Sequence, residues 1–340
     1  MSEEKKVIAG AITYPPPDDR PQEPTPAAQP KQPTDLQGLL RFAMEATDGE
    51  TQQHESHTGP IDNERKEFLE NALKSMTVGV IEILESKINI LQNADTLNEN
   101  SDVTQHVLAL ETITDYVDHI DIANDFHKIG GFSIFNPCLK CKRAEIRAGA
   151  CEVLAELCQN NPYCQRVVLD TGLIPTLLKL LSSDMSETVC AKSLYAISCI
   201  VRQHSEGFQQ FVQYEGLTVL LKTLQKNDDK LITKTTFLLS SLCTSQPDLM
   251  SRLVFLDYVP ALIKSIERER APSHEHALSL LMMLASENAS AASECKNPEH
   301  RFEEILRKHL SNIANKDECR EEEDYCRQML KLLFSSCNGL

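Results

Sequence analysis

The stretch over residues 186–224, SETVCAKSLYAISCIVRQHSEGFQQFVQYEGLTVLLKTL, decides the fold. It predicts a long helix, a short helix and a third helix joined by turns, because apolar residues recur at helical spacing and glycines interrupt them. Gly207 breaks the first apolar run, and Gly216 opens the last one. Such a unit cannot bury its apolar face alone, so it needs similar neighbours on both sides.

Copies of this unit follow one another along the chain. The stretches KIGGFSIFNPCL, LDTGLIPTLLKLL, QYEGLTVLLKTL and LDYVPALIKSI align at Gly131, Gly172, Gly216 and Tyr258, with spacings of 41, 44 and 42 residues. Tyr258 replaces the glycine, and only residues 173–175 carry a full Ile-Pro step, but the register holds over four units. A period near 42 with three helical pieces is typical of armadillo repeats. The sequence therefore predicts an all-α, armadillo-like right-handed superhelix of about four repeats with helical caps at both ends.

The chain divides into three predicted parts. Residues 1–34 contain eight of the sixteen prolines, which predicts a disordered segment. Residues 35–60 predict a short amphipathic helix and a polar linker. The armadillo-like solenoid takes up 61–340, with caps over 61–100 and 299–336 and repeats over about 103–290.

Composition limits the partners and the location. The formal net charge of −16 argues against nucleic acid, because phosphate binding needs a basic field. The acidity fits either a basic partner surface or a charge that keeps the protein soluble. No signal peptide or membrane span is predicted, so we expect a cytoplasmic protein, and the twelve cysteines are then expected to be free thiols.

Chemical motifs are weak. Cys138 and Cys141 form a CxxC, with Cys158, Cys164, His119 and His127 nearby, which are residue types that bind zinc. One CxxC without a second favours ordinary thiols over a zinc site. 

His274 and His276 point to different sides of a helix, so they are expected to be solvated or capping residues. The acidic run DECREEED over 317–324 is interpreted as a solvated face or, alternatively, a partner-binding tail. Phosphate-loop, serine-hydrolase and metalloprotease motifs are not found. We therefore expect no enzyme, no cofactor and no metal.

The long third helices should line the inner surface. Aligning them places Glu156, Cys199, Ser241 and Met283 where peptide-binding armadillo proteins such as importins and catenins carry an asparagine. In those proteins the row of asparagines, an asparagine ladder, binds the backbone of an extended peptide through its side-chain amides. This chain has neither the ladder nor a tryptophan, so the surface is expected to dock a folded protein rather than an extended peptide.

Several stretches resemble one family. DIANDF at 121–126, AELCQNNPYCQ at 155–165, LYAISCIVRQHSEGFQQF at 194–211 and HEHALSLL at 274–281 resemble the cytosolic, armadillo-type nucleotide exchange factors of the 70-kDa heat-shock chaperone, the Hsp-binding protein family. LQGLLRFAME at 36–45 is similar to the family's N-terminal helix. The resemblance implies a monomeric co-chaperone that binds the chaperone's ATPase domain with its concave face and promotes ADP release. The alternative is an armadillo scaffold for another folded protein.

The resemblance also implies partner contacts at Ala123, Asn124, Asn161 and Arg202. Ala123 and Arg202 are expected at turn or helix-end surfaces. From its residue type alone, Arg202 is either a binding hot spot or a cation that faces the dipole of its own helix C-terminus.

Overall fold

The computed structural model describes residues 79–226, 228–246, 248–314 and 316–335, all within the compact unit Glu64–Leu340. The predicted segment 1–34 and the predicted helix and linker over 35–60 lie outside these residues. The described residues are helical and contain no strand, as the sequence predicts.

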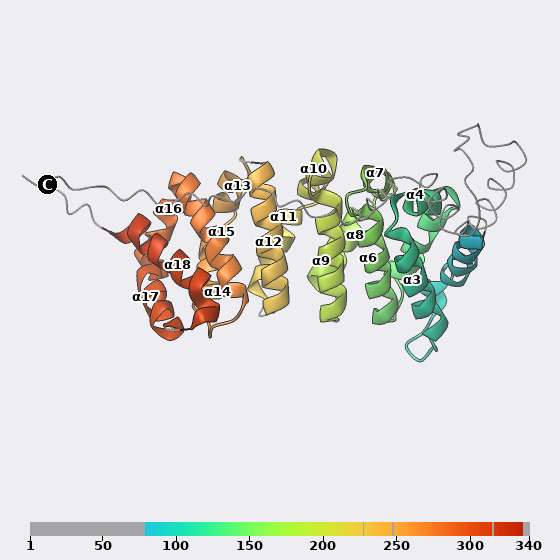
Figure 1. Ribbon diagram of the computed structural model, residues 1–340, viewed down its shortest axis with the longest axis horizontal. Coiled ribbons are helices and arrows are strands. Elements are labelled where there is room, and N and C mark those ends of the chain that lie inside the picture. Colours follow the sequence, from blue (N-terminus) through green and yellow to red (C-terminus); the bar gives the residue numbers. More distant parts are fainter. Residues whose placement is uncertain (1–78, 227, 247, 315, 336–340) are drawn as a thin grey trace, which may run out of the picture. The chain divides into compact units, whose positions relative to one another are not determined.

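Groups of three helices follow one another along the chain (Figure 1). A helix over 79–91, the short η1 (Ala94–Thr96) and α3 (Thr104–Val117) come before the first group. The short first helices are α4 (Ile120–Lys128), α7 (Pro162–Asp170), α10 (Ser205–Gln213), α13 (Leu249–Phe255) and α16 (Ala289–Cys295). The second helices are α5 (Phe135–Leu139, preceded by η2, Gly131–Ile134), α8 (Ile174–Ser183), α11 (Gly216–Gln225), α14 (Tyr258–Ile266) and α17 (Phe302–Ile313). The third helices are α6 (Ala144–Cys158), α9 (Glu187–Val201), α12 (Asp229–Ser245), α15 (Ser273–Glu287) and α18 (Arg320–Met329).

Each third helix packs against the third helix of the next group. The order α3, α6, α9, α12, α15, α18 is visible in Figure 1, and α8, α11 and α14 form a second row behind it. One continuous apolar core runs through the groups. Because every group completes the core of its neighbours, the predicted armadillo-like architecture is confirmed.

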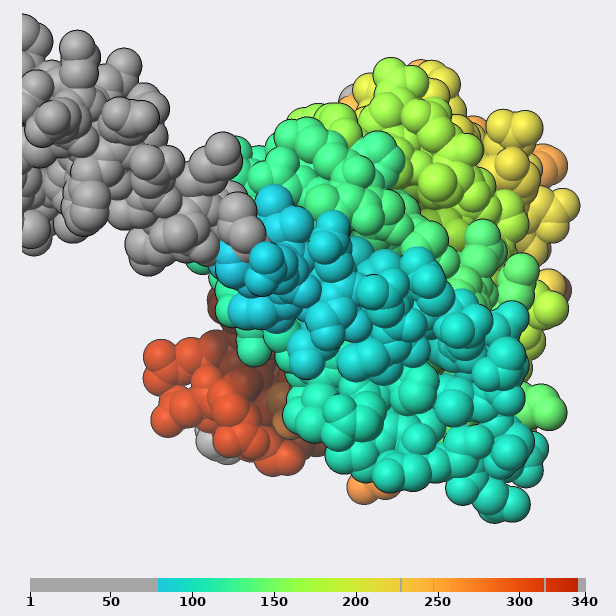
Figure 2. Space-filling model, turned by 90° about the vertical axis from the view of Figure 1, so that its right-hand side faces the viewer, coloured from blue at the N-terminus to red at the C-terminus, as the bar shows by residue number. Residues whose placement is uncertain are grey.

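Helices cover both ends of this unit. At the N-terminal end, which faces the viewer in Figure 2, the helix over 79–91 buries Leu84, Ile88 and Leu91. At the other end, α16, α17 and α18 follow the helix order of a repeat. The short η3 (Pro298–His300) and η4 (Asp317–Cys319) join them, and the π-helical turn η5 (Leu330–Phe334) follows α18.

The turn between the first and second helices has the same backbone conformation in every group. Left-handed residues occupy it, with φ values of 84°, 66°, 59°, 62° and 47° at Gly130, Gly172, Glu215, Asp257 and Arg301. Glycine adopts this conformation without steric cost, whereas the other three residues rely on the surrounding packing. The aligned residues Gly131, Gly216 and Tyr258 each follow the left-handed residue of their turn by one position, whereas Gly172 is itself the left-handed residue.

Gly131 and Gly216 are needed for close packing rather than for an unusual backbone. A Cβ atom at Gly131 would lie 2.4 Å from the ring of Phe126, and one at Gly216 would lie 2.2 Å from the ring of Phe211. In the fourth copy Tyr258 takes this place, and its buried hydroxyl donates a hydrogen bond to the Leu217 carbonyl oxygen at 2.5 Å.

Candidate protein-binding site

The structure brings three of the four predicted contact residues together between α4 and α7. The Asn161 side chain donates to the Asn124 amide oxygen at 3.1 Å, and its own oxygen accepts from the Cys164 backbone N–H at 3.2 Å. The Cys164 thiol donates to the Ala123 carbonyl oxygen at 3.7 Å. These contacts join two neighbouring first helices.

Asn161 is the N-cap of α7, and equivalent residues cap other first helices. His204 caps α10 and Asn288 caps α16, each by accepting from the backbone N–H three residues further on. Asn161 is 3% exposed, so its side chain makes its hydrogen bonds within the protein rather than at the surface. A residue that satisfies the free N–H groups of a helix start stabilises that start.

The expected surface position of Ala123 is wrong. Its side chain lies inside α4 and is 1% exposed, because it belongs to the apolar face that covers the core. Asn124 is half-buried beside it. Partner contacts at Ala123, Asn124 and Asn161 remain predictions, and the surroundings of Ala123 and Asn161 favour a structural role.

Arg202 lies at the C-terminal end of α9, as expected, and is exposed. Its guanidinium carbon is 5.7 Å from the ring centroid of Phe237 on α12, a distance that allows cation–π attraction. Phe237 is itself 57% exposed. Within the described residues no carboxylate pairs with Arg202, so its N–H donors stay available to another molecule.

A groove of about 390 Å³ lies between α9 and α12 next to Arg202 and Phe237. We call it the α9–α12 groove. Its lining residues are Gln159, Asn160, Gln165, Leu194, Tyr195, Ser198, Cys199, Arg202, Gln203, Thr233, Lys234 and Phe237. Gln165 fixes one wall, because its amide N–H groups donate to the carbonyl oxygens of Cys158 and Cys199 at 3.2 and 2.8 Å.

Tyr195 organises the polar side of this groove. Its hydroxyl hydrogen-bonds Glu156 and Gln159 at 3.2 and 3.1 Å, and the Lys234 ammonium lies 5.6 Å from its ring centroid. Burial, with the neighbouring Cys199 and Glu156, raises the pKa of Tyr195, so the hydroxyl stays protonated at neutral pH. Arg202 and Lys234 thus give the groove a local positive charge on a chain that is acidic as a whole.

The four positions at which peptide-binding armadillo proteins carry an asparagine share one environment. Glu156, Cys199, Ser241 and Met283 are all half-buried, in contrast to the fully buried residues around them on the third helices. The alignment therefore predicted correctly which face of these helices is open. It did not predict that Phe237 is exposed, because an aromatic residue in a helix normally indicates a core position.

The cysteines of the CxxC are core residues. Cys138 and Cys141 are at most 1% exposed, and the Cys138 thiol donates to the Leu91 carbonyl oxygen at 3.8 Å. Burial raises the pKa of Cys138 to about 12, so it stays a thiol at neutral pH. Cys158 and Cys164 are buried in the same way.

Two residues differ from the polar expectations. His274 is 2% exposed rather than solvated, because it packs beside His309 with ring centroids 5.3 Å apart. The acidic run 317–324 is mostly exposed, as expected of a solvated face, but its Glu322 is 1% exposed, because Arg270 and His309 bind its carboxylate.

Stacked three-helix groups with an open face and a groove define an armadillo-like binding protein. A designed armadillo repeat protein of known structure superposes with a TM-score of 0.54 at 18% identity, over 72% of this chain and 99% of the other. This likeness shows the fold. None of the described helices is both long and apolar enough to cross a membrane.

Sequence comparison identifies the family. Residues 36–126 match the family model "Nucleotide exchange factor Fes1", and residues 122–254 match "SIL1/FES1/HPBP1 C-terminal domain". Hsp70-binding protein 1 of Mus musculus is 31% identical over 91% of this chain and 88% of its own. Nucleotide exchange factor SIL1 of Xenopus laevis is 27% identical over 45% of this chain and 33% of its own. The chain belongs to the SIL1/FES1/HPBP1 family.

Proposed function

We propose that this protein is a co-chaperone that binds the nucleotide-binding domain of the 70-kDa heat-shock chaperone and promotes the release of ADP. The observation that carries the proposal is the match to Hsp70-binding protein 1 over 91% of the chain. The exposed arginine and aromatic groove on an armadillo-like scaffold supports a site for a folded partner.

Thermodynamic linkage explains how binding alone can release a nucleotide. A protein that binds the nucleotide-free conformation of the chaperone more tightly than the ADP-bound one must weaken ADP binding by the same factor. The stacked helices of this protein form a stiff support, because one core runs through all groups. No bond is made or broken in this process, so the protein acts without catalytic residues or a cofactor.

Arg202 and Phe237 form the central anchor of the proposed interface. Arginine and aromatic residues carry much of the binding energy in protein interfaces, and the guanidinium fork pairs with carboxylates at two points. The ring of Phe237 supports the face of the Arg202 guanidinium and leaves its N–H groups free to bind a partner. We propose that this pair contacts an acidic or carbonyl-rich patch on the chaperone.

We further propose a cytoplasmic, monomeric protein. The similarity to Hsp70-binding protein 1 spans about twice as much of the chain as the similarity to SIL1, 91% against 45%. The location can be measured by fluorescence microscopy of the tagged full-length chain, and the monomer by sedimentation at several concentrations.

The decisive experiment measures the release of a fluorescent ADP analogue from the chaperone's nucleotide-binding domain. The full chain should accelerate release, and ATP should displace it from the chaperone. Acceleration that saturates with added protein supports the proposal. Unchanged release at saturating protein would contradict it and favour an armadillo scaffold for another partner.

A further inference from the structure

The C-terminal end of the solenoid contains a buried cluster of three potential metal ligands. His274 on α15, His309 on α17 and Glu322 on α18 each offer one ligand atom, and these atoms lie within 4.8 Å of one another. The three residues are 2%, 4% and 1% exposed. Side chains of this kind are rarely buried together without a reason, because each must lose its hydration shell.

One ring nitrogen of His274 is buried without a partner. Its Nδ1 atom has no hydrogen-bond partner among the residues that the structure describes. Buried polar atoms are nearly always satisfied, so an orphaned one calls for an explanation such as an ion or a water molecule.

Glu322 is held in a metal-binding form by its neighbours. Its Oε1 atom accepts from Arg270 Nε and a terminal guanidinium nitrogen at 3.1 and 2.7 Å, and its Oε2 atom is 2.7 Å from His309 Nε2. Burial raises the pKa of Glu322, but the hydrogen bonds from His309 and Arg270 outweigh it and keep the carboxylate ionised. Arg270 thus orients the carboxylate from outside the cluster, as outer partners do at metal sites.

One residue of the cluster borders a surface pocket. The pocket of about 120 Å³ has His309 in its wall, together with Ile305, Lys308 and Asn312 of α17. We expect an ion to approach from this side, because His274 and Glu322 do not line the pocket.

We propose that His274, His309 and Glu322 bind a zinc ion that ties α15, α17 and α18 together. Two imidazoles and one carboxylate form a known ligand set for zinc, with the fourth position left for water. Mg²⁺ and Ca²⁺ prefer oxygen ligands alone. Zinc bonds of about 2.0–2.2 Å place tetrahedral ligand atoms roughly 3.3 Å apart. Binding would therefore move His309 Nε2 and Glu322 Oε2 slightly apart from their 2.7 Å contact and release the proton of that hydrogen bond to solvent.

This site is separate from the α9–α12 groove and from the CxxC of Cys138 and Cys141. Its three ligands lie outside residues 36–126 and 122–254, which match the family models. It also replaces the sequence-based expectation that the chain has no metal. That expectation was based on Cys138 and Cys141 and on His274 and His276, and it could not include His309 and Glu322, which join His274 only in the folded chain.

The test uses full-length reduced protein stripped of metal with a chelator. Zinc chloride is titrated in competition with a chromophoric chelator, and one zinc per chain is expected to bind. His274→Gln and Glu322→Gln should weaken binding by more than about 10-fold, because even outer partners of metal sites contribute that much. His276→Gln is the matched control on the same helix, and its affinity should equal that of wild type. Equal affinity in all four proteins would overturn the proposal.

Cobalt(II) provides a readout that does not depend on variants. Bound to this cluster, it should give the visible spectrum of a low-coordinate ion without thiolate-to-metal charge transfer. A thiolate band would assign the metal to cysteine, and failure of wild type to bind either metal stoichiometrically would refute the site. Saturating zinc should raise the melting temperature of wild type by on the order of 5 °C, and that of His274→Gln by much less.

Discussion

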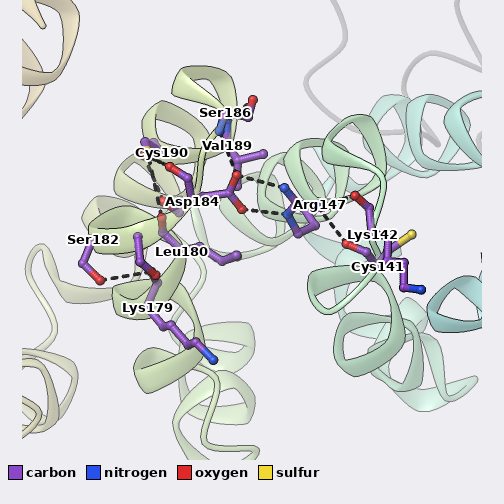
Figure 3. Close-up of polar contacts among 12 residues, drawn as sticks. Cys141, Lys142, Arg147, Lys179, Leu180, Ser182, Asp184, Ser186, Val189 and Cys190 are labelled. Carbon is purple, nitrogen blue, oxygen red and sulfur yellow. Dashed lines mark hydrogen bonds and ion pairs between the residues drawn. The ribbon is translucent and has the colours of Figure 1, made fainter. Parts of the chain in front are cut away.

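Arg147 on α6 and Asp184 before α9 form a two-point ion pair that joins neighbouring repeats. The Nε and terminal nitrogen atoms of Arg147 donate to the two Asp184 oxygens at 2.7 and 2.9 Å (Figure 3). Their side chains are 15% and 5% exposed. Arg147 also donates to the carbonyl oxygens of Cys141 and Lys142, and Asp184 accepts from the Ser186 backbone N–H.

Removing the charge of Asp184 should destabilise the solenoid. Asp184→Asn leaves the Arg147 guanidinium without its counter-charge in a mostly buried place, which costs about 3 kcal/mol. Urea denaturation followed by circular dichroism measures this loss. The control is Asp317→Asn, whose pair with Arg320 has side chains 92% and 77% exposed. The control should cost less than about 1 kcal/mol, and equal losses in both variants would contradict the prediction.

The same pair predicts a dependence on pH. Burial raises the pKa of Asp184, but the hydrogen bonds from Arg147 and from the Ser186 N–H outweigh this and bring the pKa below its usual 3.8. A depressed carboxyl pKa contributes stability above the unfolded pKa and loses it as pH falls through the folded one. The stability gap between wild type and Asp184→Asn should be constant from about pH 8 to 5 and shrink below about pH 4. A gap that stays constant down to pH 2 would argue against this ionisation.

Arg202 and Phe237 should act together in partner binding. Arg202→Ala and Phe237→Ala should each cost about 1–3 kcal/mol of affinity for the chaperone domain, with unchanged melting, because both residues are exposed. The double variant should cost less than the sum, because the two side chains are in contact. Stimulated nucleotide release over a range of concentrations measures this. Arg307→Ala is the control, since Arg307 is an exposed arginine on α17.

Ala123→Arg should unfold part of the N-terminal repeats rather than block a contact. A long charged side chain cannot fit at a position that is 1% exposed, and the cost should exceed about 3 kcal/mol. Asp121→Arg on the exposed side of the same helix should cost less than about 1 kcal/mol. If Ala123→Arg melts like wild type yet loses nucleotide release, Ala123 touches the partner after all.

Cys199 can report occupancy of the α9–α12 groove. It is half-buried and lines the groove, whereas the other cysteines among the described residues are buried. Burial raises the pKa of Cys199 to about 11, so its alkylation should be slow but faster than that of the rest. Cys337 lies outside the described residues and is replaced by Ser in this experiment. Mass spectrometry should then find that Cys199 is modified first and that the chaperone domain protects it. Alkylation at an unchanged rate in the complex would place the interface elsewhere.

The helices and the open face could be predicted from the sequence because both depend on local periodicity. Val189, Leu194 and Ile197 recur at helical spacing and are all buried. The turns could not be placed to the residue, because Glu215 and Asp257, which precede the aligned Gly216 and Tyr258, adopt the left-handed conformation although neither is a glycine.

The polar sites depend on residues far apart in the chain, which periodicity does not reveal. Glu322 looks solvated within its acidic run, and its burial is explained by Arg270, 52 residues earlier, and by His309, 13 residues earlier. The resemblance implied a contact at Ala123, and the sequence alone could not distinguish a small residue that allows close approach from one that packs in the core. The exposed position of Arg202 was predictable, because it follows the apolar residues Ile200 and Val201 at the end of a helix.

The rows of third helices have a consequence for motion. Because each helix is held mainly by its two neighbours, local opening should begin at either end and spread inward one repeat at a time. Amide hydrogen exchange should therefore be slowest in α6, α9 and α12 and faster toward α3 and α18. The α9–α12 groove lies in the slow region, so fraying of the ends leaves its geometry intact. A partner would then bind a groove that already has its binding conformation, so binding would cost no conformational entropy for ordering the groove.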